Sequence, residues 1–201
     1  MLTLYHSPMS RSSRIVRLLD EMNIADKVDI RVVEVQRHDG SGHHDAANPH
    51  PEGKVPLLDH DGVTIRESNA IMLYLTDMFP QSGLGLSIGD PKRGEYLSWL
   101  AWYGNVLEPV TVHAFAGLDH PALAAAFRGV PEATHAFVAA LEKGPFLLGD
   151  NFTAADLICA SPYVWFPDIT PDEPQIRAWI ERCQARPAAA KVMAYDQDLL
   201  A

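Results

Sequence analysis

The sequence predicts an α+β protein in which a small mixed domain precedes an all-helical domain. Three observations predict this division. Strand and helix patterns alternate over residues 1–80, residues 81–89 are rich in Gly and Ser without an apolar period, and nearly all apolar spacing over residues 90–201 is helical. A chain of 201 residues is long enough for two such domains to bury separate cores.

The first domain opens with a strand, a helix and a second strand. The apolar run Leu2–Tyr5 is typical of a short buried strand. A second strand is predicted over Val28–Val35, where β-branched residues largely alternate with charged ones. Between them, apolar residues follow the i, i+3, i+4, i+7 spacing of an amphipathic helix, at Ile15, Leu18, Leu19 and Met22.

A loop, a hairpin and a helix complete the first domain. Residues 36–53 are polar and rich in Gly and His, which predicts a loop with room for one short helix. Asp61-Gly62 stands between two apolar runs and is a pair favoured in tight hairpin turns. Helical spacing returns over Glu67–Phe79. The resulting order, β-α-β-(α)-β-β-α, is that of a thioredoxin-like domain.

The second domain is predicted to be a helical bundle. Asp90-Pro91 is typical of a helix start, with Asp as N-cap and Pro in the first turn. A helical pattern over Pro121–Leu141 contains Gly129 and Pro131, which predict a break. The other expected helices are marked by Leu97, Leu100, Gly104 and Leu107, by the segment FTAADLICA, and by Glu173–Ala185 and Ala188–Tyr195.

Composition excludes several classes of protein. The formal net charge of −10 disfavours nucleic acid and anionic membranes as main partners, because phosphate binding relies on basic patches. The N-terminal apolar patch is too short for a signal peptide, and no apolar run is long enough to span a membrane. Cys159 and Cys183 lack metal or redox spacing and lie in apolar helical patterns, so we expect buried free thiols. We therefore expect a cytoplasmic protein.

Four motifs, in order along nearly the whole chain, resemble those of cytosolic glutathione transferases. The segment LYHSPMSRSSRI is similar to their first strand and catalytic loop, and GKVPLL to the strand that bears a cis-proline. RESNAIMLYL resembles the helix that binds the γ-glutamyl group, and GDNFTAADL the folding signature of the helical domain. In FTAADL, Thr153 and Asp156 have the spacing of an acidic capping box, with Phe152 placed as a hydrophobic staple.

The resemblance implies a glutathione site in the first domain. A cis bond at Val55-Pro56 would turn the Val55 backbone N–H and C=O outward, free to pair with an extended peptide such as glutathione. At Glu67-Ser68 a helix begins, where a hydroxyl and free N–H groups suit an α-carboxylate and the acidic side chain suits the ammonium group. Lys54 is a candidate partner for the glycyl carboxylate.

The loop before this strand departs from the family pattern. NPHPEGKVP carries two extra residues before Gly53, which leaves the direction of Lys54 open. We expect the histidines of this loop to be solvated, with the alternative that one contacts the glycyl end, and we expect no metal site because HHD alone lacks ligand spacing. These histidines are His38, His43, His44 and His50.

The resemblance to serine-type members places the active hydroxyl at Ser10, four residues before Arg14. Ser12 is the second candidate, because the loop can shift by a turn. In either position the serine would donate a hydrogen bond to the glutathione thiolate and would not itself be a nucleophile. Ser7 and Ser13 are expected to cap or pack, and Tyr5 to lie in the core.

The predicted activity is conjugation of glutathione, as co-substrate and without a cofactor, to a small hydrophobic electrophile. Glutathione-dependent peroxide or disulfide reduction and non-catalytic glutathione binding are the alternatives; the absence of an N-terminal cysteine counts against reduction. By resemblance, the first long helix of the second domain borders the electrophile pocket and the interface of a homodimer. Candidate pocket residues are Tyr103, His113, Phe115 and Trp165.

Overall fold

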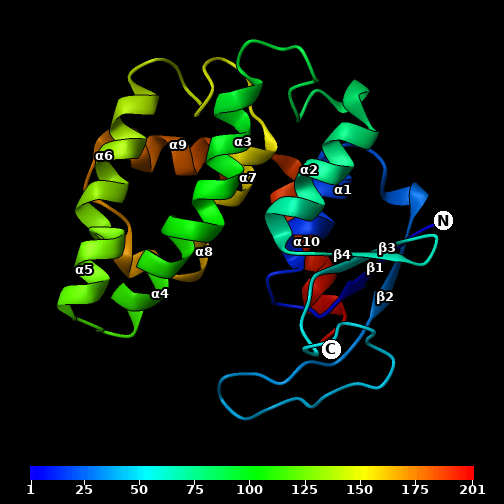
Figure 1. Ribbon diagram of the computed structural model, residues 1–201. Coiled ribbons are helices and arrows are strands. Elements are labelled where there is room, and N and C mark those ends of the chain that lie inside the picture. Colours follow the sequence, from blue (N-terminus) through cyan, green and yellow to red (C-terminus); the bar gives the residue numbers. More distant parts are fainter. The chain divides into compact units, whose positions relative to one another are not determined.

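The computed structural model describes residues 1–201 and divides them into two compact units (Figure 1). The first unit joins residues 1–82 to residues 187–201, and the second comprises residues 83–186. The helical domain expected from sequence extends over residues 90–201, whereas the structure groups residues 187–201 with the first unit. The physical reason is that helix α10 (Pro187–Asp198) packs against helix α1 (Ser13–Glu21), and Lys191 pairs with Asp20 at 2.9 Å.

The first unit contains a four-stranded mixed sheet with the order β2-β1-β3-β4. Strand β1 pairs in parallel with β2 and antiparallel with β3, which pairs antiparallel with β4. The predicted hairpin is confirmed: Asp61 and Gly62 have φ angles of 50° and 88°, the left-handed values that this turn requires. The strands are β1 Leu2–His6, β2 Val28–Val32, β3 Leu57–His60 and β4 Val63–Arg66.

Helices of the first unit bury apolar faces in its core. Helix α2 (Ser68–Met78) packs against α1. Residues 33–56 contain no helix, so the short helix that the sequence allowed in this loop is absent. Short 3₁₀ turns cover Ala25–Lys27 (η1) and Pro80–Ser82 (η2). Fully buried side chains of this core are Leu4, Ile15, Leu18, Leu19, Leu57, Leu58 and Ile71.

The second unit is entirely helical, as predicted. The expected break near Gly129 is confirmed, because Arg128 and Gly129 adopt φ angles of 57° and 81°. The first helix begins at Arg93, later than Asp90, whose carboxylate instead accepts a hydrogen bond from the Lys92 N–H in the preceding turn. The elements of the second unit are α3 Arg93–Trp102, the π-helical turn η3 Tyr103–Leu107, α4 Glu108–Phe115, α5 Pro121–Phe127, α6 Val130–Leu141, α7 Ala154–Ala160, α8 Pro162–Trp165, η4 Pro167–Ile169 and α9 Pro174–Gln184.

The core of the second unit holds large aromatic side chains, among them Trp179 and Phe137 with ring centroids 5.1 Å apart. The predicted capping box of α7 is present in both directions between Thr153 and Asp156. Cys159 and Cys183 are buried and form no disulfide, as expected. No helix of the chain has the length and apolar character needed to cross a bilayer.

Candidate active site

The loop between β1 and α1 turns its hydroxyls inward, with one exception. Ser7, Ser12 and Ser13 are buried, whereas Ser10 is partly exposed. Ser12 is the N-cap residue of α1, yet its side chain makes no capping hydrogen bond to the helix. Its hydroxyl instead accepts a hydrogen bond from the Ser7 N–H at 3.1 Å. The Ser12 side chain is therefore engaged by the loop and β1, not by the helix that it precedes.

The Ser10 hydroxyl lies on the outer side of this network. Ser10 Oγ is 2.7 Å from Ser12 Oγ and also 2.7 Å from the Ser7 carbonyl oxygen, to which it can donate. The Ser12 N–H donates to Ser10 Oγ at 3.1 Å. These contacts orient the Ser10 hydroxyl, and Ser10 is a partly exposed residue.

Behind Ser12 lies a fully buried histidine, His6, at the end of β1. Its Nδ1 is 2.8 Å from Ser12 Oγ, and its Nε2 is 3.0 Å from Asp196 Oδ1 on α10. The ring of Tyr195 stacks on the His6 imidazole with centroids 5.8 Å apart. These contacts explain why the first unit includes α10, which supplies the carboxylate that faces β1.

Asp196 also anchors the loop. Its Oδ2 accepts hydrogen bonds from the Met9 N–H at 2.7 Å and from the Ser13 hydroxyl. Met9 has a φ of 53°, a left-handed value that is uncommon for a residue with a side chain. Burial would raise the pKa of the Asp196 carboxyl, but hydrogen bonds from His6, Ser13 and Met9 outweigh it and lower the pKa.

The segment before β3 presents an unpaired stretch of backbone. The Val55-Pro56 bond is cis, as predicted, and no hydrogen bond within the chain engages the Val55 N–H or C=O. Asn48 steadies this segment, since its buried side-chain amide donates to the Lys54 carbonyl at 3.2 Å. Lys54 itself is exposed and pairs with Glu52 at 2.6 Å.

The prediction that the loop histidines are solvated is wrong for His50. His50 is buried, because its Nδ1 accepts the Glu52 N–H at 3.0 Å and its own N–H donates to Asn48 Oδ1. Burial lowers the pKa of His50 and favours the neutral ring that can accept this bond. His38, His43 and His44 are exposed, as expected.

At the start of α2 the backbone is held in an unusual conformation. Glu67, the N-cap residue, has a φ of 70° and a ψ of 126°, whereas Ser68 begins the helix and is buried. A positive φ in a residue other than glycine costs free energy and is found mostly at functional sites. Glu67 is exposed, so its carboxylate and the first N–H groups of α2 are presented side by side.

Two family models match this chain. The model described as Glutathione S-transferase, N-terminal domain matches residues 1–77, and that described as Glutathione S-transferase, C-terminal domain matches residues 106–187. The chain belongs to the glutathione S-transferase family. The thioredoxin-like unit and the helical unit described above are the two domains of this family.

Several known proteins resemble the chain over nearly its whole length. Disulfide-bond oxidoreductase YfcG of Escherichia coli (strain K12) is 28% identical, over 96% of this chain and 94% of that protein. The crystal structure of a glutathione transferase from Methylococcus capsulatus is 27% identical, with a TM-score of 0.79 and coverage of 98% of this chain and 99% of that chain. A sphingomonad glutathione S-transferase, solved in complex with glutathione, is 26% identical, with a TM-score of 0.74 and coverage of 97% and 98%.

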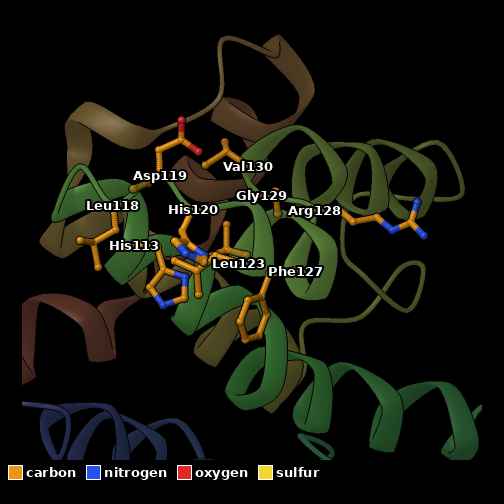
Figure 2. A pocket seen from close by; sticks show the side chains of 12 residues that line it. His113, Leu118, Asp119, His120, Leu123, Phe127, Arg128, Gly129 and Val130 are labelled. Atoms are coloured by element: carbon orange, nitrogen blue, oxygen red, sulfur yellow. The ribbon is translucent and has the colours of Figure 1, made fainter.

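One of the four candidate pocket residues lines a cavity of the second unit. A cavity of about 200 Å³ lies among α4, α5 and the start of α6, and it includes His113 but not the other three (Figure 2). Figure 2 shows His113, His120 and Phe127 grouped there, while the Arg128 side chain extends away from them. Tyr103 is buried in the core, whereas Phe115 and Trp165 are exposed by 63% and 36%.

Sequence reasoning missed three residues of the first unit. His6 follows an apolar strand and was not singled out, and Asp196 lies almost at the other end of the chain. Arg37, in the loop after β2, donates to the Pro8 carbonyl at 2.9 Å and to Ser7 Oγ at 3.2 Å. The one available signal was a histidine directly before a serine-rich loop, and it does not identify the carboxylate.

Proposed function

We propose that the protein is a glutathione transferase that joins the glutathione thiolate to small hydrophobic electrophiles. The observation that carries the proposal is the position of Ser10. Of Ser7, Ser10, Ser12 and Ser13, it is the one that is partly exposed, and neighbouring groups orient its hydroxyl. A thiol placed against this hydroxyl would receive a hydrogen bond that stabilises its ionised form.

A hydrogen bond from Ser10, together with a nearby helix N-terminus, can supply the free energy needed to stabilise the thiolate. An unperturbed thiol has a pKa of about 8.5 and is mostly protonated at neutral pH. Lowering this pKa by roughly two units requires about 2.7 kcal/mol of differential stabilisation. A hydrogen bond to a charged group contributes about 1.5–3 kcal/mol, and a nearby helix N-terminus about 0.3–1 kcal/mol.

The rest of the first unit offers complementary groups for the tripeptide. The Val55 backbone would pair with the cysteinyl residue of glutathione in the manner of an added strand. Ser68 and the N–H groups of α2 would hold the γ-glutamyl carboxylate, and Glu67 its ammonium group. Lys54 would leave its ion pair with Glu52 and pair with the glycyl carboxylate of glutathione. The solved complex of the sphingomonad relative with glutathione supports this choice of ligand.

For the electrophile, the exposed aromatic side chains Phe115 and Trp165, together with His113, are the proposed contacts. Tyr103 is 1% exposed, so we assign it to the core of the second unit and not to these contacts. We also propose that the enzyme is a homodimer. Light scattering of the purified protein would then give about twice the chain mass of 22.2 kDa.

The decisive experiment compares serine variants with an aryl halide as electrophile. Ser10→Ala is expected to raise the pKa of the bound thiol and to lower kcat by about 10- to 100-fold, in proportion to the lost thiolate. Ser98→Ala, which removes an exposed hydroxyl bonded within α3, serves as the matched control. If Ser12→Ala abolishes the thiolate and Ser10→Ala does not, the assignment to Ser10 is wrong. Glutathione binding without turnover in the parent protein would indicate a binding module.

Glutathione-dependent disulfide reduction is the second candidate, favoured by the relative from Escherichia coli that carries the name of a disulfide-bond oxidoreductase. Because Cys159 and Cys183 are fully buried, this chemistry would use the thiols of glutathione alone. Reduction of a small mixed disulfide that exceeds aryl halide conjugation, and that persists in Cys159→Ala and Cys183→Ala variants, would support this candidate.

A further inference from the structure

A continuous series of polar groups leads from the surface of the first unit to a buried carboxylate. It runs from Ser10 Oγ to Ser12 Oγ over 2.7 Å, from there to His6 Nδ1 over 2.8 Å, and from His6 Nε2 to Asp196 Oδ1 over 3.0 Å. Ser12 and His6 are 0% exposed and Asp196 is 1% exposed, so Ser10 is the only member that a ligand can touch.

One arrangement of protons connects this series, and the Ser7 carbonyl oxygen is a second acceptor within reach of both serine hydroxyls. A carboxylate can only accept, so we assign the imidazole proton of neutral His6 to Nε2, facing Asp196. His6 Nδ1 is then an acceptor, and the Ser12 hydroxyl donates to it. Ser12 Oγ in turn accepts the Ser7 N–H and is free to accept a proton from Ser10. Hydrogen bonds therefore join Ser10, Ser12 and His6 Nδ1. The last step, from His6 Nε2 to Asp196 Oδ1, is an ion-pair contact of 3.0 Å.

We propose that His6, held by Asp196, receives the thiol proton of bound glutathione through the hydroxyls of Ser10 and Ser12. This proposal rests on the proposed function and explains where the proton goes when the thiolate forms. His6 and Asp196 touch no substrate and are positioning residues, whereas Ser10 would be the catalytic contact.

The transfer balances without a further reactant. The S–H bond of glutathione breaks and its proton binds Ser10 Oγ, the Ser10 proton moves to Ser12 Oγ, and the Ser12 proton moves to His6 Nδ1. Both serines end as neutral hydroxyls. The net change is that a thiol and a neutral imidazole become a thiolate and an imidazolium, with the Asp196 carboxylate unchanged.

A carboxylate and a neutral aromatic ring lie beside His6. Asp196 is its direct partner, and the hydrogen bonds described above lower the pKa of this carboxyl, so that it is ionised at neutral pH. Tyr195, stacked on the ring, has a pKa raised by burial and by Asp196, and is neutral. Arg37 donates to Ser7 Oγ and to the Pro8 carbonyl of the same loop.

The same residue types form the triad of serine hydrolases, in which histidine activates a nucleophilic serine. Burial excludes that role for this chain. Ser12, the serine in contact with His6, is 0% exposed, so no acyl carbon can approach its oxygen. Ser10, the accessible serine, is separated from His6 by Ser12, and hence the arrangement suits proton transfer from a ligand.

The test measures the thiolate and the released proton in the same sample. At pH 7 the ultraviolet difference between bound glutathione and bound S-methylglutathione reports the thiolate, and the dependence of the calorimetric binding enthalpy on the buffer reports proton release. We expect thiolate formation with almost no proton released, because His6 retains it. In Ser12→Ala, which interrupts the series, any thiolate formed should instead release about one proton per site.

Two further measurements identify the acceptor. Ser98→Ala, which removes a hydroxyl bonded within α3 of the second unit, should release as little proton as the parent protein. In spectra of protein with isotope-labelled histidine, the His6 ring nitrogens should change from the neutral to the imidazolium pattern with glutathione but not with S-methylglutathione. His50, the other buried histidine, should not change with either ligand. The nuclear magnetic resonance comparison uses the parent protein, so it does not depend on a His6 variant that folds.

Two outcomes would overturn the relay while leaving the proposed function in place. One is thiolate formation with about one proton released by the parent protein, and the other is a His6 ring that is already an imidazolium before glutathione binds. Failure of glutathione to bind would overturn the proposed function and the relay together.

Discussion

Asp156 Oδ1 accepts a hydrogen bond from the indole Nε1 of Trp179 at 2.9 Å, so the carboxylate that caps α7 also holds the largest fully buried side chain of the protein. The same carboxylate accepts the Leu147 N–H at 2.8 Å, and its other oxygen accepts the N–H and hydroxyl of Thr153. A single side chain thus joins α7, α9 and the segment before α7.

Replacing this carboxylate should destabilise the second unit strongly. In Asp156→Ala four donors lose their acceptor, and unpaired buried donors cost about 1–3 kcal/mol each before relaxation. We expect a loss of about 3–5 kcal/mol in the free energy of unfolding, measured by urea denaturation followed by tryptophan fluorescence. Asp150→Ala, at an exposed position, is the control and should change stability by less than about 0.5 kcal/mol. Equal effects of the two substitutions would contradict the structural role of Asp156.

The features that were predictable from sequence depend on neighbours in the chain. The Asp61-Gly62 hairpin, the Thr153–Asp156 capping box and the break at Gly129 each follow from residues within a few positions, and all are present. The position of α10 was not predictable in this way. Its pattern indicates a helix, but the partner that it covers is decided by contacts with residues such as Asp20, near the other end of the chain.

The same limit applies to the candidate site. The serine loop and the cis bond at Val55-Pro56 belong to local motifs and were found from sequence. The pairing of His6 with Asp196 joins residues from opposite ends of the chain, and no local pattern contains it. The burial of His50 was missed for a related reason, because it depends on how the inserted loop folds back on Asn48.

Asn48 should control glutathione binding without contacting the ligand. Its amide bonds the Lys54 carbonyl and its carbonyl oxygen accepts the His50 N–H, so Asn48→Ala frees the segment that presents Val55. We expect the calorimetric Kd for glutathione to rise about 10-fold, the equivalent of one or two hydrogen bonds of about 1 kcal/mol. Asn151→Ala, at an exposed turn of the second unit, should leave the Kd unchanged. An unaltered Kd in Asn48→Ala would show that the segment is ordered by other contacts.

The Asp196 carboxylate should make stability depend on pH in the acid range. Its folded-state pKa is lowered, so the unfolded chain binds the proton more readily as the pH falls. The stability that the carboxylate contributes is therefore complete above the ordinary carboxyl pKa of 3.8 and is lost as the pH falls through the folded-state value. Urea midpoints measured downward from about pH 6 should decline more steeply for the parent protein than for Asp196→Asn. Parallel pH profiles would contradict the lowered pKa.

Glu67 should show opposite effects on stability and on binding. Its φ of 70° strains the backbone, and a glycine relieves the strain, so Glu67→Gly should be about 1 kcal/mol more stable than Glu67→Ala, which keeps the strain. Both variants lack the carboxylate proposed to hold the ammonium group of glutathione, and both should bind it about 10-fold more weakly or worse. Thermal unfolding of the two variants measures the strain, because Ala and Gly differ in backbone freedom. Titration calorimetry measures the loss of the carboxylate, which both variants share. Equal melting temperatures would show that the strain is borne elsewhere, and parent-like affinity in both variants would remove Glu67 from the proposed site.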